Sequence, residues 1–211
     1  MRPVFAVLPL ALFSLTLQGC SIVKALYIAV VHNSGAPPRA ERDRIDVRAD
    51  SFVRALSHTR VAVVPVAVLG RHVRTDTGAA AAVASALRTR GFRGVAGDTT
   101  PITLPFEPQP KEAAIFWSRF KALGAWVAER PRADADYVML VDVLGAPERG
   151  SIGAVHVMVV TAAGELAYHR MWNSHHAMFK TVQPHSMDDV SRLVVLDLTP
   201  SSGGGMGDGR R

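Results

Sequence analysis

Four histidines near the C-terminal end of the chain form its densest group of side chains that could do chemistry. They are His169, His175, His176 and His185. Neutral imidazole is the commonest transition-metal ligand, so the group suggests a metal site. However, His175 and His176 are adjacent and would point to opposite faces of a strand, and no cysteine or carboxylate nearby completes a tetrahedral set. We therefore predict a loop with exposed or hydrogen-bonded histidines and no metal, and keep a metal-binding or hydrolytic protein built on this cluster as the alternative.

Other residue types suited to catalysis are present but poorly spaced for it. Ser174 stands beside His175 without a Gly-x-Ser-x-Gly elbow, and catalytic triads are not assembled from sequence neighbours. Asp136, Asp142 and Glu148 could pair for acid–base hydrolysis of wall glycans. Asp136 is better explained as the start of a strand, and Glu148 as part of a turn. We predict no catalytic residue, no cofactor and no enzymatic activity.

The single cysteine, Cys20, follows a segment with the layout of a bacterial secretory signal. Arg2 precedes an apolar run from residue 4 to residue 17, and the segment ends in Leu17-Gln18-Gly19-Cys20. This ending resembles the lipobox of bacterial lipoproteins. The resemblance implies cleavage before Cys20, a diacylglycerol on its sulfur and acylation of its new amino group. Ser21 agrees with sorting to the outer membrane.

Lipidation of Cys20 would anchor the protein firmly. Each buried lipid CH₂ contributes about 0.8 kcal/mol, and two or three chains together hold a protein on a bilayer. Two alternatives stay open. The apolar residues 4–31 are long enough for an uncleaved membrane anchor, and a lone cysteine can also be a free or intermolecularly bridged thiol.

Composition divides the chain into four parts. We expect a signal peptide at 1–19, a membrane tether at 20–50, a periplasmic domain at 51–200 and a disordered, glycine-rich tail at 201–211. The formal charge is +6 and the pI about 10.1, but the basic residues are scattered and form no nucleic-acid-binding block. An arginine-rich surface in the envelope would instead face anionic lipid, anionic wall polymers or an acidic partner.

Hydrophobic patterning within the expected domain predicts an α/β (α+β) fold. Continuous apolar runs predict buried strands at 61–69 and 136–144, with a bulge or free edge at Pro65, and a short strand is expected at 94–96. Helical spacing predicts helices at 77–90 and 111–130, and a proline-rich extended loop covers 101–110. Two strand-like runs, 152–161 and 165–172, flank Ala162-Ala163-Gly164 and predict an antiparallel hairpin.

A last helix is predicted by a capping box. Ser186 precedes Asp189 by three residues, ahead of an apolar run, although the neighbouring valines 194 and 195 leave a strand as the competitor. On the 111–130 helix, four aromatic side chains are expected in the core, with a partner-binding groove as the alternative: Phe116, Trp117, Phe120 and Trp126.

Several of these segments, in order, resemble one class of envelope domain. The segments are 60–66, 86–95, 135–143, 157–172 and 186–198. They are similar to the domain shared by curli-secretion lipoproteins, penicillin-binding-protein activator lipoproteins and the amino-terminal domain of TolB. The resemblance implies a single mixed sheet with helices packed on its faces, used for docking or oligomerisation and not for catalysis.

From these observations we expect a lipid-anchored, periplasm-facing protein of the outer membrane. It would act as a non-catalytic interaction or assembly factor in envelope biogenesis, transport or wall synthesis. Its expected partners are the lipid bilayer, through Cys20, and an envelope protein, with no nucleic acid. A homo-oligomer is a further alternative.

Overall fold

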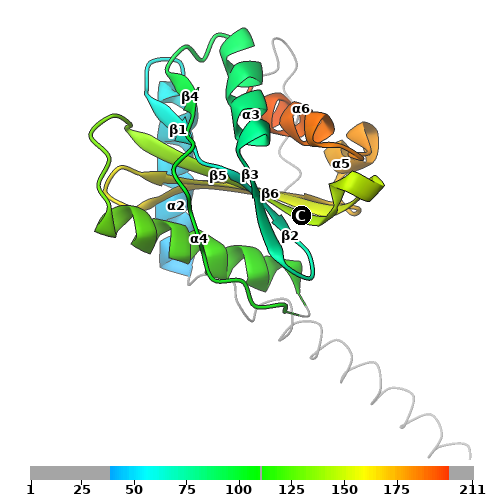
Figure 1. Ribbon diagram of the computed structural model, residues 1–211. Coiled ribbons are helices and arrows are strands. Elements are labelled where there is room, and N and C mark those ends of the chain that lie inside the picture. The colour runs from blue at the N-terminus through cyan, green and yellow to red at the C-terminus, as the bar shows by residue number, and fades with distance from the viewer. Residues whose placement is uncertain (1–38, 110, 200–211) are drawn as a thin grey trace, which may run out of the picture. The chain divides into compact units, whose positions relative to one another are not determined.

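The computed structural model describes residues 39–109 and 111–199 (Figure 1). Its elements, in chain order, are α2 (Arg39–Ala55), β1 (Val61–Val63), β2 (Val66–Leu69), β3 (Val73–Asp76), α3 (Thr77–Thr89), β4 (Val95–Gly97), α4 (Glu112–Glu129), β5 (Tyr137–Ala146), η1 (Pro147–Arg149), β6 (Ser151–Thr161), β7 (Leu166–Asn173), α5 (Ala177–Val182) and α6 (Met187–Leu198). The expected signal peptide, Cys20 and the tail at 201–211 lie outside the described residues. Within 39–109 and 111–199, no helix is long and apolar enough to cross a membrane.

The strands form one seven-stranded mixed sheet, which confirms the predicted α/β fold. β5 lies at its centre and pairs in parallel with both β1 and β2. On its other side β5 pairs antiparallel with β6, and β6 with β7. β4 extends the sheet beyond β1 in parallel, and β3 extends it beyond β2 antiparallel.

The predicted irregularity at Pro65 divides the expected 61–69 strand into β1 and β2. Val63 pairs with Met139, and Ala67 pairs with Asp142. Four steps along the first strand therefore match three along β5, so one extra residue is accommodated around Pro65 as a bulge. Proline has no N–H to donate, which explains why the ladder is interrupted there.

Helices cover both faces of the sheet (Figure 1). α3 and α6 pack on one face, where β-strand valines meet Val83, Leu87, Leu193 and Leu198. α4 packs on the opposite face through Ile115, Phe116, Phe120, Leu123 and Val127, together with Ile102 and Leu104 of the proline-rich loop. Each face has its own apolar core, and the sheet separates them.

The folded region begins earlier than the expected boundary at residue 51. α2 starts at Arg39, within the expected tether, and Ile45 is only 2% exposed. Ile45 belongs to the core on the α4 face, whereas Phe52 belongs to the core on the α3/α6 face. Between them, Arg48 donates to the carbonyl oxygen of Leu166 at 3.1 Å. α2 therefore covers the β7 edge of the sheet, and the polar, low-hydrophobicity composition of residues 39–50 concealed this role.

The hairpin and the last helix were predicted correctly. β6 and β7 pair antiparallel, and Gly164 in their turn has φ of +81°, a conformation that L-residues other than glycine rarely adopt. α6 begins with the reciprocal Ser186–Asp189 capping box. Besides α2, two elements were missed: β3, whose four residues are mostly exposed, and α5, which is only six residues long.

Candidate interaction site around the β5–β6 turn

Three cavities open around the turn that joins β5 to β6. The turn contains η1, and glycines with positive φ lie near its two ends: Gly145 at +137° and Gly150 at +66°. A Cβ on Gly145 would approach the carbonyl oxygen of Ser151 to 2.4 Å. Glycine is therefore required at this position, both for its backbone conformation and for the close approach of the two strands.

The turn lies where two parallel strands end. β2 ends at Leu69 and β5 at Ala146, so their carboxyl ends meet at one edge of the sheet. In open α/β sheets, ligands bind outside the carboxyl ends of the strands, where connections diverge. The position of the three cavities agrees with this general pattern.

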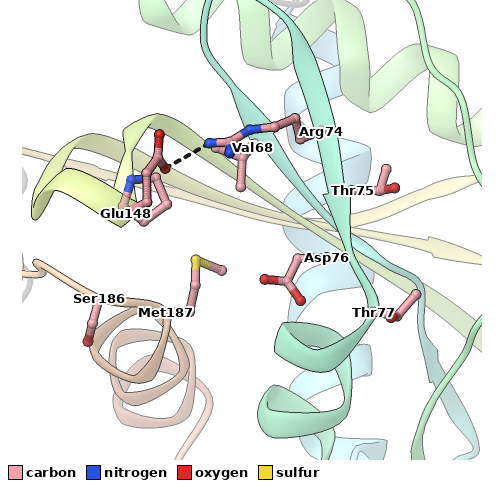
Figure 2. A pocket seen from close by; sticks show the side chains of 9 residues that line it. Val68, Arg74, Thr75, Asp76, Thr77, Glu148, Ser186 and Met187 are labelled. Atoms are coloured by element: carbon pink, nitrogen blue, oxygen red, sulfur yellow. Dashed lines mark hydrogen bonds and ion pairs between the residues drawn. The ribbon is translucent and has the colours of Figure 1, made fainter.

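The first cavity, of about 480 Å³, lies on the α3/α6 face (Figure 2). Val68 forms part of its wall, Arg74 and Asp76 enter from β3, and Glu148 comes from η1. Met187, at the start of α6, contributes an apolar, polarisable thioether. The cavity therefore combines apolar surface with both signs of charge.

An ion pair bridges this cavity. Arg74 donates to Glu148 at 2.7 Å, joining β3 to the β5–β6 turn (Figure 2). The hydrogen bond from Arg74 is the main cause that holds the pKa of Glu148 below its usual value. Because the two side chains are 56% and 48% exposed, the pair is screened by water and contributes little to stability. Arg74 can therefore readily exchange Glu148 for another acidic partner.

Two helix starts border the same cavity. The Asp76 carboxylate accepts from the Ala79 backbone N–H at 2.8 Å and caps α3. Ser186 caps α6, and Asp189 accepts from the backbone N–H groups of both His185 and Ser186. These bonds, the one from His185 first, lower the pKa of Asp189.

The second and third cavities flank the other sides of the turn. One, of about 420 Å³, is lined in part by Gly150, Ser151, Lys180 and His185. The other, of about 620 Å³, lies on the α4 face between the proline-rich loop and the ends of β2 and β5, and its lining includes Phe106. Ser151 lines both, so the turn is a shared wall.

The structure does not assemble the four histidines into one site. His169 packs against Phe120 with ring centroids 5.4 Å apart. The backbone N–H of His175 donates to the side-chain oxygen of Asn173. His176 Nδ1 accepts from the backbone N–H of Met178 and so caps α5. Among residues 39–109 and 111–199, no group of three or more His, Cys, Asp or Glu side chains is placed to hold a metal ion.

His185 alone of the four lies at the candidate site. Its Nδ1 is 2.9 Å from the carbonyl oxygen of Gly150 and ties the start of α6 to the turn. Ser174, the considered nucleophile, lines the same cavity as His185.

The three carboxylates considered for acid–base chemistry lie in separate ion pairs. Asp136 accepts from Arg60 at 2.9 Å, and Glu148 from Arg74. Asp142 is fully buried and accepts two hydrogen bonds from Arg119. They do not face a common cavity, so the arrangement offers no paired acid and base.

The aromatic side chains of α4 are mainly core residues, as predicted. Phe116 and Phe120 are 1% and 0% exposed, and Trp117 is 9% exposed. Trp126 is partly buried, with the Arg130 guanidinium 5.5 Å from its ring centroid.

Sequence reasoning named Glu148 and His185 of the site, but it did not single out Arg74 and Asp76. Arg74 and Asp76 belong to β3, whose four residues carry too little apolar periodicity to be recognised. The one available signal was Asp76 itself, an acidic residue directly before an alanine-rich helix and therefore a candidate cap.

Comparison with known proteins gives no family for this chain and a distant structural match. No protein-family model and no curated protein sequence matches the chain. Among solved structures, it is similar to a PelC dodecamer from Paraburkholderia phytofirmans, with a TM-score of 0.32 and 16% identity, covering 65% of this chain and 88% of that one. That protein is a dodecamer by its description, and at this level of similarity the match carries no argument about this chain. The expectation of a homo-oligomer therefore stays open.

Proposed function

We propose that this protein is a lipid-anchored, periplasm-facing lipoprotein of the outer membrane that binds a partner protein of the envelope. It would act without catalysis, as an assembly factor in envelope biogenesis, transport or wall synthesis. The lipidated Cys20 confines the domain to the membrane surface. The partner contacts the rim, which is the surface around the β5–β6 turn where the three cavities open.

One observation carries this proposal: three cavities share the β5–β6 turn as a wall, with charged and apolar side chains mixed along the rim. Interfaces of this mixed kind are typical of non-obligate complexes. Support for a binding role comes also from the candidate acids, which lie in three separate ion pairs, away from one another.

Site-specific photo-crosslinking in living cells tests the binding surface. A photoreactive amino acid at Arg149, exposed in the turn, is expected to capture one recurring protein of the envelope. The matched control is Arg90, which is also exposed but lies at the C-terminal end of α3. Equal capture at both positions, or none at Arg149, would contradict the proposed surface.

Metabolic labelling with a fatty-acid analogue tests the anchor. The wild-type protein should be labelled, and Cys20→Ala should not.

The alternative function is tested by metal analysis of the purified protein. Stoichiometric zinc or copper that is lost in the His175→Ala/His176→Ala double variant would replace our proposal with a metal-binding one.

A further inference from the structure

The two outer edges of the sheet differ in what lies against them. The β7 edge is covered by α2, and Arg48 donates to the carbonyl oxygen of Leu166 there. On the other side of β5, β3 and β4 both end the strand order, and β3 has no further strand paired to it among the described residues. Val73, Arg74 and Thr75 are exposed, and Val73 is 40% exposed although apolar. An antiparallel edge strand presents the N–H and C=O groups of alternate residues outward, ready to pair with another strand.

The side chains of β3 are sorted by charge between the two faces of the sheet. Arg74 is opposite Val68 and Asp76 is opposite Val66, so both charged residues lie on the α3/α6 face. Val73 and Thr75 alternate with them and lie on the α4 face. The four residues of β3, Val73–Asp76, are therefore apolar, basic, polar and acidic in chain order along one edge of the sheet.

This order is complementary to itself when the strand is reversed. If two copies of β3 pair antiparallel with Thr75 opposite Thr75, each Arg74 comes opposite the Asp76 of the other copy. Opposite charges placed directly across an antiparallel pair stabilise it, and the same two-fold axis produces the contact twice. We propose that β3 is a self-association edge, where a second copy of this chain adds to the sheet with this register.

Neither charge is committed elsewhere in a way that prevents this pairing. Arg74 bonds to Glu148 in an exposed, solvent-screened pair that can be exchanged. Asp76 uses its Oδ1 to cap α3, which leaves its second oxygen for a partner's guanidinium. The contact is short, since β3 has four residues, so we expect a dimer that dissociates and re-forms readily.

Such a dimer has a consequence for the proposed function. A two-fold axis perpendicular to an antiparallel sheet keeps equivalent faces of the two copies on the same side. The two 480 Å³ cavities would then open on one face of a continuous sheet, one in each copy. The dimer itself does not depend on lipidation or on any partner protein.

Cysteine crosslinking tests the register in purified, detergent-solubilised full chain that carries Cys20→Ser, which removes the only native thiol. Directly opposed residues of an antiparallel pair have Cα atoms about 4.5–5.5 Å apart, within the range that a disulfide spans. We expect Thr75→Cys to give a covalent dimer under mild oxidation. Val47→Cys, on α2 and 67% exposed, is the matched control and should stay monomeric. A monomeric Thr75→Cys protein, or equal dimer at both positions, would overturn the proposal.

Charge complementation provides a second, independent test. Arg74→Asp alone places acid against acid in the homodimer, and Asp76→Lys alone places base against base. Each single variant should dimerise at least about tenfold more weakly than the Cys20→Ser chain by analytical ultracentrifugation. Mixed together, the two variants restore both opposite-charge pairs, and a heterodimer should form. Glu148→Gln removes only the ion pair of Arg74 within one copy and should leave dimerisation intact. Failure of the mixture to restore association would refute the register.

Discussion

Arg119 on α4 and Asp142 on β5 form an ion pair that is almost wholly removed from solvent, with side-chain exposures of 2% and 0%. Arg119 Nη2 donates to Asp142 Oδ1 at 2.9 Å, and Nε donates to Oδ2. Arg119 Nη1 donates to the carbonyl oxygens of Leu104 and Pro105, each at 3.2 Å. One guanidinium thus joins the helix, the central strand and the proline-rich loop. Burial raises the pKa of Asp142, while Arg119 acts in the opposite direction.

We predict that removing either partner is strongly destabilising. Arg119→Met and Asp142→Asn should each lower the free energy of unfolding by about 3–5 kcal/mol, because the remaining partner stays buried without its counterpart. The Arg119→Met/Asp142→Leu double variant should lose less than the two single losses combined. Urea unfolding of all three proteins measures the coupling, and strictly additive losses would contradict it.

A second prediction concerns pH and the buried His156. This side chain is 2% exposed, and burial, with smaller contributions from His169 and Arg119, holds its pKa well below the usual value. The pKa of His169 is also lowered, mainly by burial. Because the unfolded chain then binds protons that the folded chain does not, stability should fall as pH drops below about 6.5.

Urea midpoints between pH 7.5 and pH 5.5 check this dependence. Each such histidine contributes at most about 1.4 kcal/mol per pH unit in this window. His156→Leu should flatten the slope, whereas His58→Leu, at an exposed position, should leave it unchanged. An unchanged slope in His156→Leu would contradict our assignment. The raised pKa of Asp142 works in the opposite sense, because the folded chain then binds a proton more tightly than the unfolded chain.

A third prediction concerns the contact between α4 and the β6–β7 turn. A Cβ on Gly124 would lie 2.6 Å from the carbonyl oxygen of Gly164. Glycine to alanine within a helix normally stabilises by up to about 1 kcal/mol. Here Gly124→Ala should instead destabilise by on the order of 2 kcal/mol, through overpacking against backbone. Gly153→Ala is the control, since its Cβ would meet only the carbonyl oxygen of Leu144 at an ordinary 3.6 Å.

A fourth prediction concerns the cap of α6. Ser186→Ala removes the hydroxyl that accepts from the Asp189 N–H and should reduce stability by about 1 kcal/mol. Ser51→Ala is the comparison, because its hydroxyl only donates to the Val47 carbonyl within an exposed helix face. Thermal unfolding of both variants separates the two effects. Equal, negligible losses would show that the capping box does not contribute.

Local patterns were enough to predict most of the elements. The Val/Ala run of β1 and β2, the helical spacing of α4, the Gly164 turn and the Ser186–Asp189 box each act over a few neighbouring residues, so periodicity and cap chemistry reveal them. The short polar β3 and the whole of α2 escaped because their stability comes from what they pack against, not from their own composition.

The sequence by itself determined the class of fold, the order of its main elements and the lipobox-like segment at Cys20, because each depends on contiguous residues. Only the tertiary structure decided that Asp142 pairs with Arg119, that the four histidines are dispersed, and that Arg74 meets Glu148 beside the β5–β6 turn. These relationships join residues far apart in the chain, and strand pairing and helix packing alone fix which of them come together.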